Sequence, residues 1–258
     1  MLALVSPAKK LDFESEWNAP TLTQSDFLDH TQELVDVAKA LTQAEIQSLM
    51  KLSDKLGALN YARYQQFSTP FAPDNAKPAV YTFRGDTYVG LDADSLSDDD
   101  LGFAQEHFRM LSGLYGMLRP LDLMQPYRLE MGTKLSNARG EDLYDFWGDI
   151  LTRACNDATQ GHKNRAVICL ASNEYIKAVQ PKGLEGDFIT CHFKDVKNGA
   201  AKVIGLFAKR ARGSMARYMI QNRVEQPEDL KSFDTDGYVY QDGKSDAYNY
   251  VFLRNQEV

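Results

Sequence analysis

Apolar residues near the start of the chain follow two patterns, a short continuous run and a helical repeat. Residues 2–5 are all apolar and are followed closely by Pro7, which predicts a short buried strand, because proline cannot donate a hydrogen bond to a sheet. Residues 25–39 carry apolar side chains at helical spacing, which predicts an amphipathic helix with an acidic outer face. Lys9 and Lys10 therefore follow the carboxyl edge of a strand.

Two helix starts lie close together after this amphipathic helix. Thr42 and Glu45 have capping-box spacing, and Ser53 provides a second N-cap signal. Two helices joined by a short turn loosely resemble a helix-hairpin-helix, in which backbone amides bind a DNA phosphate, and Lys51 and Lys55 then become DNA-binding candidates. The glycines that shape such a hairpin are absent, so an ordinary αα-hairpin is the alternative interpretation.

The middle of the chain mixes β-prone runs with glycine and proline. Residues 79–83 and 87–91 flank the glycine-bearing turn 84–86, which predicts a hairpin or strand pair. Acidic residues favour a helix start near Asp100, and the helix is expected to run toward Leu114. Beyond it, a stretch of glycines, prolines and charges among bulky apolar groups is typical of a loop that lines a site.

A strand-to-helix turn in the second half forms a candidate anion site. Residues 143–154 predict a helix, residues 166–171 a buried strand and residues 173–179 a helix that leaves its end. Free N–H groups at the start of such a helix can bind an anion, which makes Ser172 and Asn173 candidates.

The C-terminal third predicts two further hairpins around one basic helix. Residues 188–194 and 201–205 read as strands on either side of the turn at residues 198–199. A basic helix is expected over residues 206–224, and a last hairpin over residues 237–253.

These elements predict an α/β fold of the mixed α+β kind, with one compact domain over residues 1–258 and a mixed sheet flanked by helices. The chain is 43% hydrophobic and 25% charged, which is typical of a globular protein. The N-terminal apolar run is too short for a signal peptide, and no stretch approaches the roughly 20 apolar residues of a membrane span. We therefore expect a cytoplasmic protein that does not bind membranes.

The three cysteines predict buried thiols rather than a disulfide scaffold or a metal site. Cys155, Cys169 and Cys191 form no C-x-x-C pair, and none has histidines at zinc-ligand spacing. Cys191 adjoins His192, and a neighbouring imidazolium lowers the pKa of a thiol, so redox sensing is an alternative for that residue. We predict no metal site and no cofactor.

The net charge of -7 hides an uneven distribution. Residues 1–160 carry a net charge of -10, residues 161–225 carry +7 and residues 226–258 carry -4. Between residues 194 and 217, Asp195 is the one acid among seven basic residues, namely Lys194, Lys197, Lys202, Lys209, Arg210, Arg212 and Arg217. Neutralising phosphates releases condensed counterions, so this cluster favours DNA as a partner. A solvated helix face balanced by acids elsewhere is the alternative.

Enzyme motifs are largely missing from the sequence. It contains no G-x-x-x-x-G-K phosphate loop, no G-x-S-x-G elbow and no H-E-x-x-H pair. An enzyme acting on a nucleoside or nucleic-acid glycosidic bond is the alternative to a binding protein. In that case Lys9 or Lys10 would be the nucleophile, with Asp86 or Glu130 as the assisting acid.

Several motifs together resemble one protein family. They are Ser-Pro-Ala-Lys at residues 6–9, Phe-Arg-Gly-Asp-Thr-Tyr at residues 83–88, the run from Leu111 to Met131, Ala-Ser-Asn-Glu-Tyr at residues 171–175 and Ala-Lys-Arg-Ala-Arg-Gly-Ser-Met at residues 208–215. These motifs span nearly the whole chain. Together they resemble the YaaA family of bacterial peroxide-stress resistance proteins.

The resemblance implies a cytosolic protein that helps cells survive hydrogen peroxide and is associated with limiting free iron. It also implies a family-specific fold that binds DNA through a basic cleft with a helix-hairpin-helix-like element. We expect a monomer that prefers bent, branched or bubble DNA over a particular sequence, with a transient association with iron. The expected DNA-binding residues are Lys9, Lys10, Lys51, Lys55, Tyr127, Arg128, Lys194, Lys209, Arg210, Arg212 and Arg217.

Three carboxylates near the central loop are the natural ligands if iron binds directly. They are Asp86, Asp122 and Glu130, because carboxylate oxygens suit hard cations. Each could equally pair with a nearby arginine, namely Arg84, Arg119 or Arg128, and ion pairing is the interpretation we favour.

Overall fold

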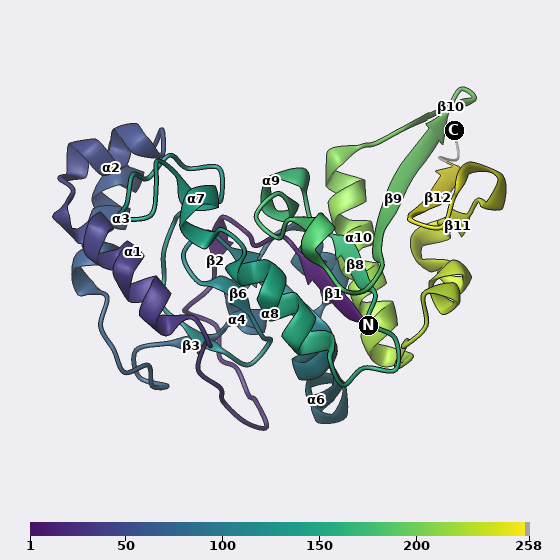
Figure 1. The fold of residues 1–258 in the computed structure, drawn as a ribbon, viewed down its shortest axis with the longest axis horizontal. Helices are drawn as coiled ribbons and strands as arrows, with labels where there is room; N and C mark the ends of the chain where they lie inside the picture. The colour runs from purple at the N-terminus through teal and green to yellow at the C-terminus, as the bar shows by residue number, and fades with distance from the viewer. Residues whose placement is uncertain (256–258) are drawn as a thin grey trace.

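A central eight-stranded sheet organises the computed structural model, which describes residues 1–255 (Figure 1). The strands run in the order β11-β12-β9-β8-β1-β5-β6, with β10 paired to β9. Strands β12, β9, β8, β1 and β5 are parallel neighbours, and β6, β10 and β11 are antiparallel to theirs. The expected mixed sheet is therefore confirmed. The strand bounds are β1 Leu2–Val5, β5 Phe108–Ser112, β6 Gly116–Leu118, β8 Val167–Leu170, β9 Phe188–Lys197, β10 Ala200–Lys202, β11 Val239–Tyr240 and β12 Asn249–Asn255.

Strand β1 lies inside the sheet, between β8 and β5, and in the core. All four of its residues are buried, and Leu4 pairs with Cys169 of β8 on one side and with Arg109 of β5 on the other. A parallel strand that is covered on both faces requires a continuous apolar run, which is the pattern found in the sequence.

Helices cover both faces of the sheet and extend it at one end. Helix α8 lies in front of the sheet in Figure 1 and α10 behind it, while α1, α2 and α3 gather at the end opposite the β9–β10 hairpin. The bounds are α1 Leu28–Ala40, α2 Gln43–Leu49, α3 Asp54–Gln66, α4 Ala79–Thr82, α5 Asp86–Leu91, α6 Asp98–His107, α7 Leu143–Trp147, α8 Ile150–Thr159, α9 Asn173–Ile176 and α10 Gly205–Gln221. Two small ladders join β2 Lys10–Leu11 to β4 Phe83–Arg84, and β3 Lys77–Pro78 to β7 Leu123–Met124. Within residues 1–255, no helix is both long and apolar enough to cross a membrane.

Several local predictions are confirmed. The Thr42–Glu45 capping box forms both of its reciprocal hydrogen bonds at the start of α2. Asn198 and Gly199, with φ of 52° and 75°, make the turn between β9 and β10. Strands β11 and β12 form the last hairpin. In each case the signal depends on residues close together in the chain.

The hairpin expected over residues 79–91 is wrong. The segment forms α4, the short strand β4 and α5 instead. Residues 87–91 are β-prone, but they pack against α10 through Gly90, and this tertiary contact outweighs the local preference.

The helix expected to reach Leu114 ends at His107, and residues 108–112 continue as β5 beside β1. Periodicity cannot separate a fully buried strand from a buried helical turn, which explains this error. The helix expected over residues 143–154 is divided into α7 and α8 at Gly148, whose φ is 47°.

Two glycines allow helices α5 and α10 to approach until their backbones touch. A Cβ atom on Gly90 would collide with the carbonyl oxygen of Arg210, and one on Gly213 would collide with the carbonyl oxygen of Thr87. The obstacles are backbone atoms, which cannot rotate away as a side chain can. This contact therefore sets the spacing between the start of α5 and the basic face of α10.

We predict that Gly213→Ala lowers the free energy of unfolding by about 1–3 kcal/mol, because the added methyl group overpacks the α5–α10 contact. Gly102→Ala in α6 is the matched control, since no atom of residues 1–255 that could obstruct it lies within 4 Å of the Cβ it would add. The control should stabilise the protein by about 0.5–1 kcal/mol through helix propensity. Urea unfolding of both variants measures the difference, and equal stabilities would contradict the close contact.

Candidate functional site

The path of the chain through the sheet reverses at β1 and β8. From β1 the chain moves to β5 on one side, and from β8 it moves to β9 and then β12 on the other. In open α/β sheets, ligands bind beyond the carboxyl ends of the strands at such a switch point. A cavity of about 380 Å³ lies at this place and is lined by residues that follow β1 and β8.

The carboxyl ends of β1 and β8 are tied together at the base of this cavity. The backbone N–H of Ser172 donates to Ser6 Oγ at 2.8 Å, and Ser6 Oγ lies 3.3 Å from Ser172 Oγ. Tyr88 of α5 donates its hydroxyl proton to the Ser6 carbonyl at 3.1 Å. The candidate anion-binding N–H of Ser172 thus has an internal partner, and Asn173 is not among the residues that line the cavity.

The cavity lining is rich in positive charge. Six cationic side chains face three carboxylates, which leaves a formal excess of three positive charges. The cations are Lys9, Lys10, Arg84, Arg128, Lys209 and Arg212, and the carboxylates are Asp86, Glu130 and Glu174.

Glu130 neutralises two of these cations. Its carboxylate lies 2.8 Å from Lys9 Nζ and 3.5 Å from an Arg128 guanidinium nitrogen, while 61% of the Lys9 side chain remains exposed. Arg128 Nε is buried and has no hydrogen-bond partner within residues 1–255. The Tyr64 hydroxyl donates a hydrogen bond to the backbone carbonyl of Arg128 at 2.8 Å, which positions the Arg128 backbone.

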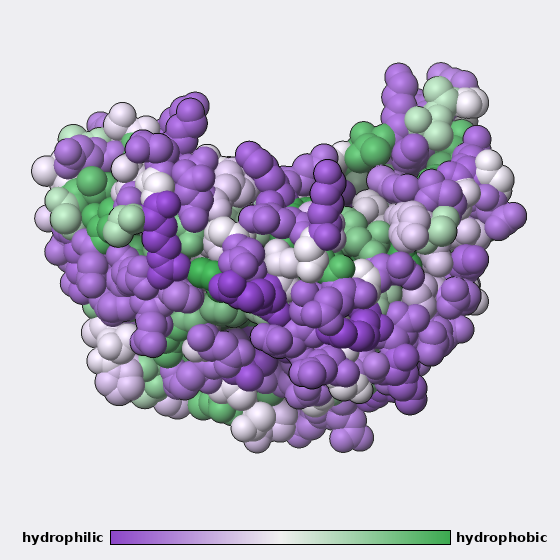
Figure 2. Space-filling model, viewed as in Figure 1, coloured by the Kyte–Doolittle hydropathy of each residue, from purple (hydrophilic) through white to green (hydrophobic). Residues whose placement is uncertain are grey.

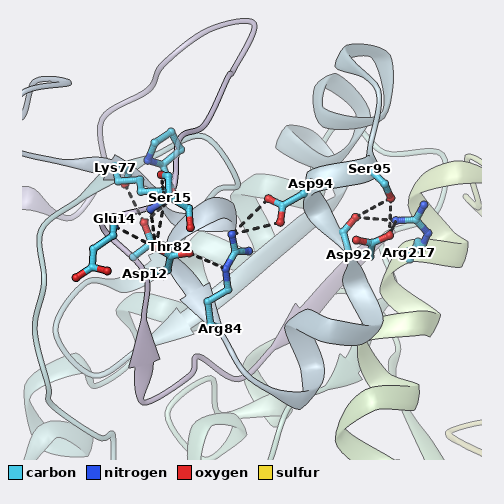
Figure 3. A network of polar contacts seen from close by, with 11 residues as sticks. Asp12, Glu14, Ser15, Lys77, Thr82, Arg84, Asp92, Asp94, Ser95 and Arg217 are labelled. Carbon is cyan, nitrogen blue, oxygen red and sulfur yellow. Dashed lines mark hydrogen bonds and ion pairs between the residues drawn. The ribbon is translucent and has the colours of Figure 1, made fainter.

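Arg84, which also lines the cavity, belongs to a separate network of polar contacts (Figure 3). Its guanidinium lies between Asp12, at 3.2 Å, and Asp94, at 3.3 Å. Asp12 also accepts backbone hydrogen bonds from Glu14 and Ser15, both at 3.0 Å. This network fixes the segment that follows Lys10 and leaves Arg84 already neutralised.

Three cations of the lining have no carboxylate partner within ion-pair distance in the described part of the chain: Lys10, Lys209 and Arg212. Lys10 and Lys209 are exposed, whereas Arg212 is half-buried. Burial lowers the pKa of Arg212, yet a guanidinium stays charged in proteins. The buried neighbours of Arg212 are the thiols of Cys169 and Cys191, which do not neutralise it.

Asp86 is a carboxylate of the lining that, like Arg212, has no charge partner in the described residues. It is half-buried at the first turn of α5, and no ion pair or side-chain hydrogen bond to it occurs among residues 1–255. The expected pair with Arg84 is not formed, because Arg84 is held by Asp12 and Asp94. Asp86 also lines a neighbouring cavity of about 920 Å³, so it stands at the boundary between the two.

The other two expected ion pairs are present. Arg119 lies 3.0 Å from the buried carboxylate of Asp122, and Arg128 lies near Glu130 as described above. No group of three or more His, Cys, Asp or Glu side chains in residues 1–255 is arranged to hold a metal ion.

Three of the remaining basic candidates do not line the cavity. Arg217 donates to the carbonyls of Leu91, at 3.0 Å, and Asp92, at 2.8 Å, at the end of α5. Lys194 is on the face of β9 opposite the buried residues, which include Cys191 close to Arg212 of α10. Arg210 is exposed on α10 outside the cavity lining.

Lys51 and Lys55 lie in the turn and first turn of the α2–α3 pair, at one end of the molecule (Figure 1). Lys51 has a φ of 51°, so a lysine occupies the left-handed position that glycine would occupy more easily. The surface of the molecule is hollowed between this end and the end that bears the β9–β10 hairpin (Figure 2).

Two side chains proposed for contact or redox chemistry are more buried than the sequence suggested. Tyr127 is 6% exposed and its hydroxyl lies 2.7 Å from Ser112 Oγ, which leaves little ring surface for a stacked base. Cys191 is 1% exposed, and burial raises the pKa of its thiol. His192 follows on the opposite face of β9, so it does not activate that thiol.

Sequence reasoning missed the part of the site that holds the strand ends together. Ser6, Tyr88 and Tyr175 line the cavity without belonging to any charge pattern. The signal that could have found them is topological. A buried strand followed by Ser-Pro and another followed by Ala-Ser would be adjacent if both belonged to one parallel sheet.

We predict that Asp12→Asn lowers the free energy of unfolding by about 1–3 kcal/mol at neutral pH, because charge-assisted hydrogen bonds are lost. The backbone N–H groups of Ser15 and Glu14 and the charge of Lys77 hold the pKa of Asp12 well below its ordinary 3.8. The stabilisation is present above that value and is lost as the pH falls below it.

Thermal unfolding over a pH series tests this prediction. The difference in unfolding temperature between wild type and Asp12→Asn should become smaller below a pH of about 4. Asp74→Asn removes an exposed carboxylate outside the network and should follow wild type throughout. A gap that persists in acid would contradict the role of the ionised carboxylate.

The sequence is similar to a family of bacterial proteins over its full length. A family model described as peroxide stress protein YaaA matches residues 1–244. UPF0246 proteins of Alteromonas mediterranea and Shewanella baltica are 56% and 54% identical over 257 residues, covering 100% of this chain and 99% and 100% of those relatives. A UPF0246 protein of Aliivibrio fischeri is 51% identical over 100% of this chain and 99% of its own length.

Proposed function

Since the chain belongs to the peroxide stress protein YaaA family, we propose that it acts in the cytosol by binding DNA during peroxide stress. In this proposal the phosphates bind at the cavity beyond the ends of β1 and β8. Recognition depends on the shape of the DNA rather than on its sequence.

The observation that carries the proposal is a set of cations without carboxylate partners in residues 1–255, namely Lys10, Lys209 and Arg212. Arg212 is half-buried, and a half-buried charge without a partner becomes more favourable when an anion supplies the missing contacts. A guanidinium matches a phosphate with two parallel hydrogen bonds. The cavity thus offers what a phosphate requires.

The charge distribution supports a preference for distorted DNA. The cavity lies beyond the strand ends rather than on a projecting surface, and residues 1–160 carry a net charge of -10. Acidic surroundings repel a straight polyanion and steer it toward the basic opening. A bend, bulge or junction brings phosphates into a recess more readily than a straight duplex does. The α2–α3 pair, with Lys51 and Lys55, provides a second contact in this proposal.

The connection to peroxide and iron follows from counterion exchange. Ferrous iron held at DNA phosphates produces hydroxyl radicals from peroxide at the place where it binds. A protein that neutralises phosphates releases the condensed cations from them. DNA binding of this kind therefore moves iron away from the DNA, without requiring a resident metal site in the protein.

We predict that Lys209→Ala combined with Arg212→Ala weakens DNA binding and lowers the slope of log affinity against log salt by about 2, because two phosphate contacts are lost. Lys182→Ala combined with Lys244→Ala is the matched control, since it removes the same charge from exposed positions outside the cavity. Fluorescence anisotropy with duplex, bulged and four-way-junction DNA across a salt series measures both.

The control pair should keep the wild-type slope and the preference for distorted DNA. If the two double variants lose affinity equally, the net charge of the protein and not the cavity drives binding, and the proposed site is wrong. If the wild-type protein does not bind DNA, the proposed function itself fails.

The glycosidic-bond enzyme ranks second because its nucleophile lacks activation. Lys9 is 61% exposed and pairs with Glu130 at 2.8 Å, and a nucleophilic lysine needs desolvation. Lys10 is also exposed. The observation in favour of this alternative is that Lys9 and Glu130, the candidate nucleophile and acid, lie next to each other. Trapping of a covalent lysine adduct with borohydride would support it.

A further inference from the structure

We infer that the cavity receives one nucleotide swung out of the DNA stack, with its phosphate on Lys209 and Arg212 and its base on Asp86, and that it favours guanine. This inference rests on the proposed DNA binding and adds the ligand of the cavity itself. It is carried by the Lys209–Arg212 pair and Asp86, which line one small cavity and have no charge partner within residues 1–255.

The size of the cavity fits a single nucleotide. Its volume of about 380 Å³ is at the lower end of the roughly 300–1,000 Å³ of small-molecule sites. A paired duplex cannot enter such a space, whereas enzymes that read a single base take it out of the helix into a closely fitting pocket.

The phosphate end of the site lies on α10. Lys209 and Arg212 are three residues apart, so they are neighbours on one helical face, and both line the cavity. The Gly213 contact with α5 holds this face beside the turn that carries Asp86. The cationic pair on α10 and the Asp86 carboxylate are therefore held at the same cavity.

A carboxylate without a partner in the described residues needs an explanation in a site for a polyanion. Asp86 is half-buried, accepts no side-chain hydrogen bond in the described residues and would repel a phosphate. An ionised carboxylate has acceptors and no donor, so its ligand must supply N–H or O–H groups. A base that enters beside the phosphate supplies them.

Guanine is the base whose edge suits a carboxylate best. Its N1–H and N2–H groups are adjacent donors that can meet both carboxylate oxygens at once. On the corresponding edges of adenine, cytosine and thymine, a donor stands next to acceptors, which would face the carboxylate unfavourably. Asp86 therefore distinguishes an extruded guanine from the other three bases.

The rest of the lining suits the flat body of a base. Pro7 and Ala8 are half-buried apolar residues of the lining, whereas Tyr88, Tyr175 and Leu129 are buried and offer only their edges. Small-molecule sites commonly combine such walls with a few convergent polar groups. The energy needed to unstack a base is smallest where pairing is already broken, which agrees with a preference for distorted DNA.

Three duplexes of equal length test the inference, one fully paired, one with a single bulged guanine and one with a bulged thymine at the same position. Wild-type protein should bind the guanine bulge about tenfold more tightly than the thymine bulge, which is the scale of one bidentate base contact. Asp86→Asn should reduce that ratio to near one, because asparagine presents one acceptor and one donor.

The ratio is the decisive readout, since a change in net charge acts equally on both bulges. Asp74→Asn, with the same change in charge outside the cavity, should keep the wild-type ratio. Equal affinity of wild-type protein for both bulges, or a ratio unaltered by Asp86→Asn, overturns the inference while DNA binding stands. Failure to bind any of the duplexes overturns the proposed function instead.

Discussion

The site depends on one packing constraint, the contact of helices α5 and α10 through Gly90 and Gly213. Backbone atoms meet there, so the two helices can neither separate nor slide without losing the fit. Helix α10 carries Lys209 and Arg212, and α5 begins at Asp86. Two residues without side chains thus determine where three charged side chains lie.

A second constraint is the reversal of the chain at β1 and β8, which leaves a recess beyond their carboxyl ends. Hydrogen bonds between Ser6 and Ser172 join the two strand ends, and the Tyr88 hydroxyl attaches α5 to the same place. The charges around this recess are only partly compensated. Glu130 neutralises Lys9, and Asp12 and Asp94 neutralise Arg84, whereas Arg212 and Asp86 have no partner in residues 1–255. This uneven pairing separates the groups that hold the recess together from those available to a ligand.

Local signals in the sequence predicted much of the fold, because they depend on neighbouring residues. The strand over residues 2–5, the capping box at Thr42 and the turn at Asn198 were all predicted and confirmed. The helix α5 was missed, since the reason for it lies more than 100 residues away, at Gly213. The strand β5 was missed because an apolar run buried on both faces has no period to read.

The candidate site was predicted in part. The sequence placed seven basic residues in one cluster, but the folded chain divides them. Lys209 and Arg212 line the cavity. Lys194 lies on the face of β9 opposite its buried residues, and Arg217 donates to the carbonyls at the end of α5. Which side of a strand or helix meets the core cannot be derived from charge spacing alone, and the unpaired state of Asp86 required knowing where Arg84 points.

In the proposed complex, DNA binds at the cavity beyond β1 and β8. Lysine acetylation footprinting by mass spectrometry, with and without bulged duplex DNA, locates the bound DNA. DNA should protect Lys10 and Lys209 from acetylation, while Lys182 and Lys244, exposed outside the cavity, react as before. Unchanged reactivity of Lys10 and Lys209 in the complex, with protection confined to Lys51 and Lys55, would place the DNA at the α2–α3 pair and contradict the account.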